Sequence, residues 1–323
     1  MQMGSKAWES RKVVIVGAGD VGATFAYALA QSGIADDIAL MDLRREQAEG
    51  QVLDLAHGLA FMPAFHIHVA EDADYSDADV IVITAGARQK PRESRLSLVQ
   101  RNAIIVRQIV DEIVRAKSQA VIVIVTNPVD VLTYVALKQS GFSKGMVIGS
   151  GTVLDTARFR YMLGRHCKID PRNVHGYILG EHGDNQFAAW SMTHLAGNPI
   201  DRYCSVCKEC GNWANTRERI EREVRESAYH IISYKGSTFY AVGLALVRIV
   251  GAILRNENSV LTVSTLLEGE YGIRDVCLSV PCLLGGQGIE RILAGEMPVQ
   301  EMTKLQKSAE VLHDIIAQLG PLS

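Results

Sequence analysis

The 323-residue sequence contains no apolar run of the roughly 18 residues that a membrane-spanning helix requires. Residues 1–12 are polar and lack the apolar centre of a secretory signal peptide. Neither sign of charge predominates, because 33 Lys and Arg residues are balanced by 36 Asp and Glu. A formal net charge of -3 provides no broad cationic field for nucleic-acid phosphates. We therefore expect a cytosolic protein that binds neither membranes nor nucleic acids.

Six cysteines without a secretory signal are expected to be free thiols rather than a disulfide framework. Three of them have the spacing Cys204-x-x-Cys207-x-x-Cys210, in which thiolates could hold zinc or an iron–sulfur cluster. The sequence offers no fourth ligand close by, since His194 lies ten residues upstream. We therefore expect free thiols in an exposed loop here, and no metal site in the chain.

The first half of the chain alternates Val/Ile-rich runs with helical stretches. Buried strands are predicted at 12–16, 37–41, 79–84 and 120–126, and helices at 21–32 and 45–59. This alternation favours a doubly wound α/β parallel sheet over residues 1–150. The second half mixes helices predicted at 153–166, 212–234, 238–255 and 298–319 with strands at 174–179, 188–194, 260–266 and 277–284. We expect an α+β domain over 151–323, joined to the first without a linker.

A glycine-rich turn follows the first predicted strand. Gly17, Gly19 and Gly22 form the pattern G-x-G-x-x-G, and the chain then enters a predicted helix. The first glycine permits the tight turn, the second lets the backbone approach a pyrophosphate, and the third allows close helix–strand packing. Asp42, at the end of the next strand, would accept hydrogen bonds from ribose hydroxyls and repel a 2′-phosphate. The pattern predicts a site for NAD rather than NADP, although the nearby Arg44 could favour a 2′-phosphate.

Several further motifs occur in one order along the chain. They are Ile83-Thr84-Ala85-Gly86-Ala87, Thr126-Asn127-Pro128-Val129-Asp130, Leu154-Asp155-Thr156-Ala157-Arg158, Gly180-Glu181-His182-Gly183-Asp184 and Ser279-Val280-Pro281. With the glycine turn, they make the sequence resemble the L-lactate/malate dehydrogenase family over nearly its whole length. The resemblance implies a Rossmann domain followed by an α+β substrate-binding domain. It also implies cofactor contacts from Gly17, Gly19, Asp20, Val21, Gly22, Asp42, Thr84, Ala85, Gly86 and Asn127.

The chemistry of a 2-keto acid matches the residues of these motifs. His182 can donate a proton to the carbonyl oxygen, because the ordinary pKa of histidine, about 6.5, lies near working pH. Asp155 would hold the other ring nitrogen and stabilise the imidazolium. Arg158, three residues along the same helix, would grip the substrate carboxylate, or else form only an intrahelical ion pair with Asp155. Arg95 would polarise the carbonyl, unless it belongs to a solvated basic run.

Two further residues are expected in the substrate pocket. The resemblance implies that Asn127 hydrogen-bonds the substrate oxygen or the cofactor, and that Thr238 offers a pocket hydroxyl. Thr238 could instead be only a helix N-cap. The polar segment 87–98 is expected to form a lid that expels water and brings Arg95 to the carbonyl.

Gln89 bears on the choice of substrate. Malate enzymes that resemble this chain carry an Arg before the Lys-Pro pair, and here Gln89 precedes Lys90-Pro91. A neutral Gln cannot pair with the second carboxylate of oxaloacetate, and an unpaired buried charge is costly. Pyruvate and L-lactate are therefore favoured over malate and over bulkier 2-hydroxy acids. A lid shifted by one residue would instead turn Arg88 to the substrate.

An alternative from another functional class is a non-catalytic regulatory protein that binds NAD.

Regulation and assembly are suggested by the resemblance alone. Arg160 and His175 match two positions that bind fructose 1,6-bisphosphate in activated bacterial members of the family. The same pair occurs in unregulated members, so it permits activation without establishing it. The family is usually tetrameric and sometimes dimeric, and we expect a homotetramer with contacts through 43–59 and 212–234.

Overall fold

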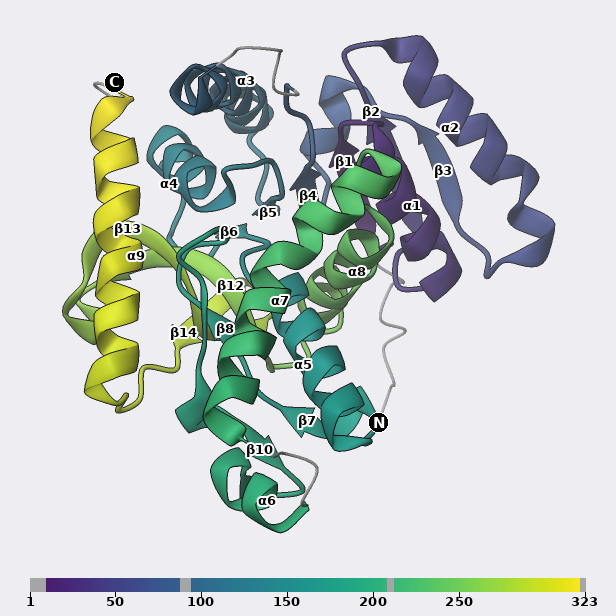
Figure 1. Cartoon of the computed structure of the whole chain (residues 1–323). Coiled ribbons are helices and arrows are strands. Elements are labelled where there is room, and N and C mark those ends of the chain that lie inside the picture. Colours follow the sequence, from purple (N-terminus) through teal and green to yellow (C-terminus); the bar gives the residue numbers. More distant parts are fainter. Residues whose placement is uncertain (1–9, 88–93, 208–211, 320–323) are drawn as a thin grey trace, which may run out of the picture.

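The structure is a computed structural model that describes residues 10–87, 94–207 and 212–319, with the backbone alone at 95 and 205–207. Figure 1 shows a central sheet with helices packed against it, and a smaller group of helices and short strands at one end. Within the described residues, no helix is both long and apolar enough to cross a membrane.

Six parallel strands form one half of the main sheet. They are β1 (Lys12–Val16), β2 (Asp37–Met41), β3 (His66–Val69), β4 (Val80–Ile83), β5 (Val121–Ile124) and β6 (Val147–Gly149). Their spatial order is β3-β2-β1-β4-β5-β6, so the sheet is doubly wound and the strand order reverses at β1. The expected Rossmann architecture is therefore confirmed.

The same sheet continues into the second half of the chain. Three antiparallel strands, β12 (Ser259–Glu268), β13 (Arg274–Gly285) and β14 (Gly288–Ile292), extend it to nine strands. The junction is a single pairing, in which Ser264 of β12 lies opposite Gly149 of β6. The two halves of the chain therefore share one sheet.

Helices cover both faces of this sheet, because the strands are apolar on both sides. Val13 and Ile15 of β1 pack with α1 (Asp20–Ser32) and α8 (Tyr240–Leu254). Val14 and Val16 face the opposite way and pack with α3 (Arg95–Arg115) and α4 (Val129–Ser140). Successive side chains of a strand point to opposite faces, so one strand feeds two cores. Two further helices pack against the sheet. α2 (Arg45–His57) leads through the short helix η1 (Leu59–Phe61) to β3, and α9 (Val299–Gln318) contacts β13.

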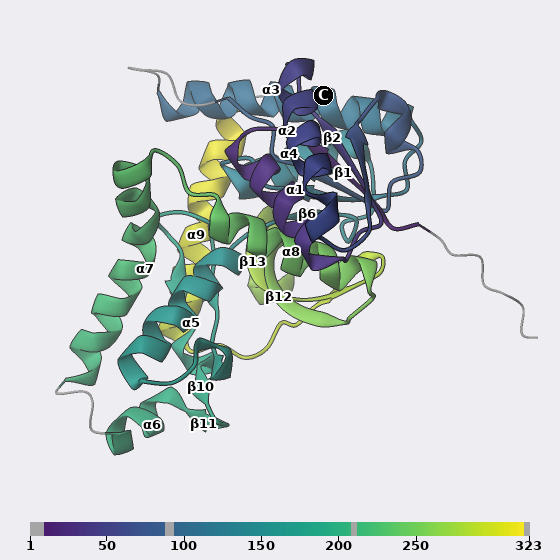
Figure 2. The same cartoon turned by 90° about the vertical axis from the view of Figure 1, so that its right-hand side faces the viewer.

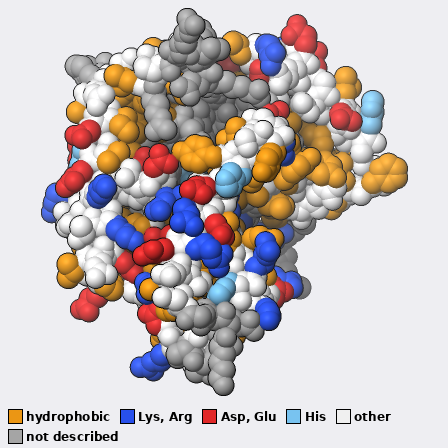
Figure 3. Space-filling model, in the orientation of Figure 1, with side chains coloured by type: hydrophobic (Ala, Val, Ile, Leu, Met, Phe, Trp, Pro, Cys, Tyr) orange, Lys and Arg blue, Asp and Glu red, His pale blue; other side chains and the backbone are white. Residues whose placement is uncertain are grey.

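A third core lies in the second half. It is built by α5 (Val153–Cys167), α6 (Ile200–Cys207) and α7 (Trp213–Lys235) around two small sheets (Figure 2). The small sheets consist of β7 (Val174–His175), β10 (His194–Leu195) and β11 (Asn198–Pro199), and of β8 (Ile178–Leu179) and β9 (Phe187–Ala188). The side chains of Phe159, Trp190 and Ile220 are buried in this core. Figure 3 shows acidic and basic side chains intermingled over the region of α7, in agreement with the balanced composition.

Five local predictions need correction. Segment 174–179 is not one strand, because β7 and β8 lie in different small sheets. Segment 188–194 is not one strand, because the helix η4 (Trp190–Met192) separates β9 from β10. The last part of the expected lid, 95–98, is the first turn of α3, which Ser94 caps by accepting from the Ser97 N–H. The helix predicted from 238 begins at Tyr240. Cys204 is buried within α6 rather than exposed in a loop, since that helix needs an apolar face toward the third core.

Candidate active site

The glycine turn has the geometry that its pattern predicts. Gly17 has a φ of 110°, a conformation that side-chain-bearing residues rarely adopt. A Cβ on Gly22 would lie 1.8 Å from the carbonyl oxygen of Gly17, so only glycine lets α1 pack so closely on the turn. Gly19 differs from both, because a Cβ there would meet nothing within 4 Å. Its Cβ direction points into open space beside the turn, where a phosphate group could approach the backbone and the start of α1.

A cleft of about 1100 Å³ opens at this turn, along the carboxyl ends of β1, β2 and β4. Seven of the residues assigned to the cofactor line it, namely Gly17, Gly19, Asp20, Asp42, Thr84, Ala85 and Gly86. The other three, Val21, Gly22 and Asn127, do not line the cleft. Gly22 supports the cleft indirectly, because it allows α1 to pack closely on the glycine turn. The residues of the cleft thus fit a dinucleotide, with backbone N–H groups at one end and a carboxylate at the other.

Asp42 is held in place at the end of β2. Its Oδ2 accepts a hydrogen bond from the Ala18 N–H at 2.8 Å, and its Oδ1 accepts from the Arg44 N–H at 2.9 Å. Each carboxylate oxygen retains a further acceptor position for a ribose hydroxyl. The guanidinium of Arg44 hydrogen-bonds the Gln47 side chain, and Gln47 also donates to the Ala18 carbonyl at 2.8 Å. Asp42 therefore presents its charge at the position where a 2′-phosphate would have to lie.

Asp155 and His182, which are 27 residues apart in sequence, meet in the second half of the chain. Asp155 lies in the first turn of α5, and His182 follows the turn after β8. Gly180 makes this turn with a φ of 94°, and its backbone pairs with Ser279 of β13. His182 Nδ1 lies 2.6 Å from Asp155 Oδ2. The other ring nitrogen, Nε2, is therefore the one left to face a substrate.

The same carboxylate also holds Arg158. Asp155 Oδ1 accepts from Arg158 Nη1 at 2.8 Å, so one buried carboxylate bridges an imidazole and a guanidinium. The ion pair that the sequence allowed as an alternative is thus present. Among the described residues, no other hydrogen bond engages the Arg158 guanidinium, so its remaining N–H groups can still grip an anion.

Charge tunes both partners of the Asp155–His182 pair. Burial of His182 favours its neutral form, but the Asp155 carboxylate outweighs that effect and raises the pKa of His182. Burial also opposes ionisation of Asp155, yet the charges of His182 and Arg158 lower the pKa of Asp155 below its ordinary value. The side chain of Asp155 is 2% exposed and that of His182 is 26% exposed, so the imidazole is the member within reach of a ligand. Asp155 therefore favours the protonated form of His182, which can release its proton to a bound oxygen.

Sequence reasoning missed Asp130, which supports this pair. Its Oδ2 accepts from the His182 backbone N–H at 2.7 Å, and its Oδ1 accepts from the Ser264 hydroxyl at 2.5 Å. Complete burial raises the pKa of Asp130 to about 6, although both hydrogen bonds act in the opposite direction. Asp130 ends the motif Thr126-Asn127-Pro128-Val129-Asp130, but the sequence assigned it no role, and an acid in the first turn of a largely apolar helix was a further signal. Asp130 fixes the backbone of His182 and ties it to β12.

Asn102 was also missed, and it connects the cleft with this pair. The side chain of Asn102 is buried in α3. It donates to the carbonyl of Asn127 at 2.9 Å and accepts from the N–H of Ala87 at 2.8 Å. Ala87 lines the nucleotide cleft, and Asn127 lies three residues before Asp130. The chain of contacts therefore runs from the cleft to His182 through two polar side chains.

Three predicted site residues remain, namely Gln89, Arg95 and Thr238. Gln89 lies outside the described residues, and Arg95 is described only as the first residue of α3. Thr238 is half-buried and is not the N-cap of α8, since Phe239 holds that position. Its neighbour Ser237 donates to the Asp20 carboxylate at 2.8 Å, which brings this segment to the rim of the nucleotide cleft.

The two predicted effector residues lie away from this site. Arg160 Nε donates to the carbonyl of Gly176 at 3.1 Å, next to the exposed His175. Burial lowers the pKa of Arg160, and the like charge of Arg248 adds to the effect. Arg160 and Arg248 line a separate cavity of about 330 Å³ between α5, α8 and β12, and the Arg248 guanidinium is bonded to Glu257 and Ser259. Cys210 and the side chain of Cys207 lie outside the described part of the chain, and Cys204 is buried in α6.

Comparison with protein families gives two matches that together span the chain. Residues 11–149 match the model of the lactate/malate dehydrogenase NAD-binding domain, and residues 152–320 match the lactate/malate dehydrogenase α/β C-terminal domain. The L-lactate dehydrogenase of Treponema denticola is 55% identical, covering 97% of this chain and 99% of that protein. The L-lactate dehydrogenase of Acetivibrio thermocellus is 52% identical, covering 96% of this chain and 97% of that protein.

Solved structures give the same result. A lactate dehydrogenase from a Medee basin deep-sea metagenome library has a TM-score of 0.94 at 41% identity, covering 97% of this chain and 100% of that one. The minor L-lactate dehydrogenase of Enterococcus mundtii, in a ligand-bound form, has a TM-score of 0.93 at 41% identity, covering 96% and 98%. These likenesses extend over the nucleotide cleft and the Asp155–His182 pair together.

Proposed function

The chain belongs to the lactate/malate dehydrogenase family, and on that premise we propose that it interconverts pyruvate and L-lactate with NAD, using His182 as the proton donor and acceptor. It is an NAD-dependent L-2-hydroxy-acid dehydrogenase. The observation that carries the proton-transfer role is the 2.6 Å contact between Asp155 and His182, beside a guanidinium with unused N–H groups. A regulatory protein that only bound NAD would not need a buried proton store next to an anion-binding group.

The residues of the site divide the reaction between them. NADH, when bound in the cleft, supplies the hydride that adds to the carbonyl carbon of pyruvate. Arg158 holds the substrate carboxylate through the N–H groups that Asp155 leaves unused. His182 donates its Nε2 proton to the carbonyl oxygen as negative charge develops there, and Asp155 stabilises the imidazolium beforehand. Arg95, at the start of α3, is proposed to polarise that carbonyl, and Asn127 and Thr238 to complete the pocket.

Substrate choice is proposed to depend on Gln89. A neutral side chain there leaves the second carboxylate of oxaloacetate unpaired, which disfavours binding, whereas the methyl group of pyruvate needs no partner. The assay measures NADH oxidation with pyruvate and with oxaloacetate. Gln89→Arg should raise the ratio of oxaloacetate to pyruvate activity by about tenfold or more, which is about 1.4 kcal/mol of discrimination. Gln318→Arg, which adds the same charge on exposed α9, is the matched control and should leave the ratio unchanged.

Either assay can contradict this assignment. A wild-type preference for oxaloacetate would make the protein a malate dehydrogenase and turn Arg88 or Arg92 to the substrate. An unchanged ratio in Gln89→Arg would mean that residue 89 does not face the substrate.

We further propose that the cavity at Arg160 binds fructose 1,6-bisphosphate as an activator. Arg160 and Arg248 line it, and His175 lies next to the carbonyl that holds Arg160. The Arg248 guanidinium is already paired with Glu257, so Arg160 is the group proposed to bind a phosphate. Activation should disappear in Arg160→Ala and persist in Arg165→Ala, which removes a guanidinium from the same helix outside the cavity. Activation that survives Arg160→Ala would exclude this cavity.

Assembly into a homotetramer is proposed for the same chain. Large apolar side chains are exposed on and around α2 and η1, where Leu53 is 58% and Phe61 is 89% exposed, and on α7, where Tyr234 is 88% exposed. Exposed apolar clusters of this kind mark interaction surfaces. Light scattering coupled to gel filtration measures the mass of the particle. A monomeric wild type, or a Leu53→Glu variant with unchanged mass, would contradict the α2 surface.

A further inference from the structure

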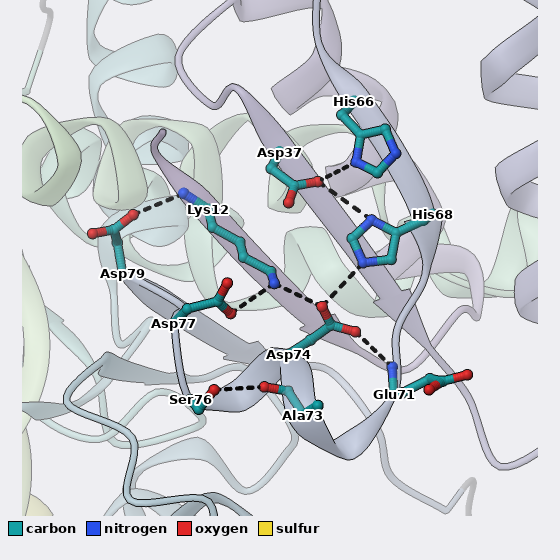
Figure 4. Close-up of polar contacts among 10 residues, drawn as sticks. All are labelled: Lys12, Asp37, His66, His68, Glu71, Ala73, Asp74, Ser76, Asp77 and Asp79. Atoms are coloured by element: carbon teal, nitrogen blue, oxygen red, sulfur yellow. Dashed lines mark hydrogen bonds and ion pairs between the residues drawn. The ribbon is translucent and has the colours of Figure 1, made fainter. Parts of the chain in front are cut away.

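A group of titratable side chains lies on the nucleotide-binding half, near the amino ends of β2 and β3. The cofactor cleft lies at the other, carboxyl ends of the strands. His66 and His68 both belong to β3, and Asp37 is the first residue of the neighbouring strand β2. Residues two apart on a strand point to the same face, so both imidazoles are on one side of the sheet. The parallel register places Asp37 directly opposite His66. Figure 4 shows the two rings side by side, facing the Asp37 carboxylate.

The distances are those of ligands around one metal ion. Asp37 Oδ1 lies 2.9 Å from His66 Nδ1 and 3.3 Å from His68 Nδ1. One nitrogen or oxygen atom from each of the three residues lies within 4.8 Å of the others. Tetrahedral zinc, with bonds of about 2.0–2.1 Å, places its ligand atoms about 3.3 Å apart. The three groups therefore need only small side-chain rotations to share one ion.

Asp74 supports the inner imidazole from behind. Its Oδ1 lies 3.1 Å from His68 Nε2 and 2.6 Å from Lys12 Nζ, and its Oδ2 accepts from the Glu71 N–H at 2.7 Å. The Lys12 ammonium and the Glu71 N–H hold this carboxylate in place beside the ring. With the His68 proton on Nε2, facing Asp74, the lone pair of Nδ1 is directed toward Asp37. Carboxylate–histidine pairs of this kind orient metal-binding imidazoles.

The Nδ1 atom of His68 then lacks a suitable partner. This atom is buried and makes no hydrogen bond among the described residues, although Asp37 Oδ1 lies 3.3 Å away. A neutral imidazole has one N–H and gives it to Asp74, so a lone pair on Nδ1 faces an anionic oxygen. A cation bound by both atoms would satisfy this lone pair and the carboxylate together.

We propose that Asp37, His66 and His68 form a binding site for a divalent transition-metal ion of the zinc type, with water as the remaining ligand and Asp74 as a positioning residue. Two imidazoles and one carboxylate suit zinc and its neighbours rather than magnesium or calcium, which prefer oxygen ligands. The ion would join the edge strand β3 to β2. Because Asp42 and the cofactor cleft lie at the carboxyl end of β2, the site would be structural and separate from the chemistry of the enzyme.

The test uses the full chain without an affinity tag, freed of metal by chelation and gel filtration. Calorimetric titration with Zn²⁺ should give one equivalent per chain with a micromolar or tighter Kd, and Co²⁺ should develop the visible absorption of a tetrahedral ion. His66→Ala and Asp37→Asn should each weaken binding at least tenfold. Asp74→Asn should weaken it by about 10–100-fold without removing a ligand. His57→Ala, an exposed histidine of α2 outside the group, is the matched control and should bind normally.

Three results would overturn the proposal. Equal affinity in His66→Ala and wild type would show that the ion binds elsewhere, and the His66 side chain is 69% exposed, so this variant should fold. A thiolate-to-cobalt absorption that persists in His66→Ala would place the ion on cysteines. Lack of any binding by the folded wild type would show that the three side chains form only a hydrogen-bonded group.

Discussion

Replacing Asp155 by Asn tests the proposed proton transfer most directly. The substitution keeps the shape of a side chain that is 2% exposed but removes its charge. The lost contact is a hydrogen bond of 2.6 Å to an imidazole that must become charged. Hydrogen bonds to charged groups contribute about 1.5–3 kcal/mol. At about 1.36 kcal/mol per tenfold change in rate, kcat/KM for pyruvate should fall by about 10- to 160-fold.

The same variant should change the pH dependence in a defined direction. Asp155 raises the pKa of His182, so pyruvate reduction, which needs the imidazolium, persists to higher pH in the wild type. Without that carboxylate, the pKa of His182 falls, and the alkaline decline in pyruvate kcat/KM should move to lower pH. Lactate oxidation needs the neutral imidazole, and the pH above which it is active should move in the same direction.

Two measurements separate this effect from general damage. NADH affinity, measured by fluorescence, should be unchanged, because Asp155 does not line the cofactor cleft. The melting temperature should fall, because Arg158 also loses its charged partner, but the variant should remain folded at the assay temperature. Pyruvate activity within twofold of the wild type, with an unmoved pH profile, would refute the role assigned to the pair.

Further predictions follow from the backbone contacts of the site. Gly19→Ala should fold normally, because a Cβ there meets nothing within 4 Å, but it should bind NADH at least tenfold more weakly, because that Cβ enters the cleft. Gly22→Ala should fail to fold, since its Cβ would lie 1.8 Å from a carbonyl oxygen. Thermal melts and NADH fluorescence titrations measure both, and normal NADH binding by Gly19→Ala would argue against pyrophosphate at that position. Asp130→Ala should lower the free energy of unfolding at pH 7 by about 2–4 kcal/mol, as two buried donors lose their acceptor. Urea denaturation measures the change, and Ser264→Ala, which leaves the His182 N–H bonded, should cost less.

Local patterns in the sequence identified the nucleotide-binding turn and the elements on either side of it. A glycine turn, a buried strand before it and an acid after the next strand are all short-range features, and their physical requirements hold wherever the turn occurs. The Asp155/Arg158 spacing on one helix face was equally readable. His182 was identifiable from its motif, although its partner lay on a different element. The helices that the sequence predicted end within a few residues of their observed ends, but α3, α4, β3 and β6 were not predicted.

Only the tertiary structure decided which distant groups meet. Asp130 and Asn102 are polar residues in helices, and nothing local reveals that one holds the His182 N–H and the other connects Asn127 with Ala87. Cys204 was expected in a loop, and it is buried because α6 turns an apolar face to a core formed by α5 and α7.

The group on β2 and β3 illustrates the same division. The sequence displays His66-x-His68, but only the parallel register of β2 and β3 places Asp37 opposite His66, and only the turn after β3 returns Asp74 to His68. Sequence fixes which side chains share a face, because that depends on a period of two along one strand. The partner across the strand depends on how the whole sheet is assembled, and that is set by the packing of helices far away in the chain.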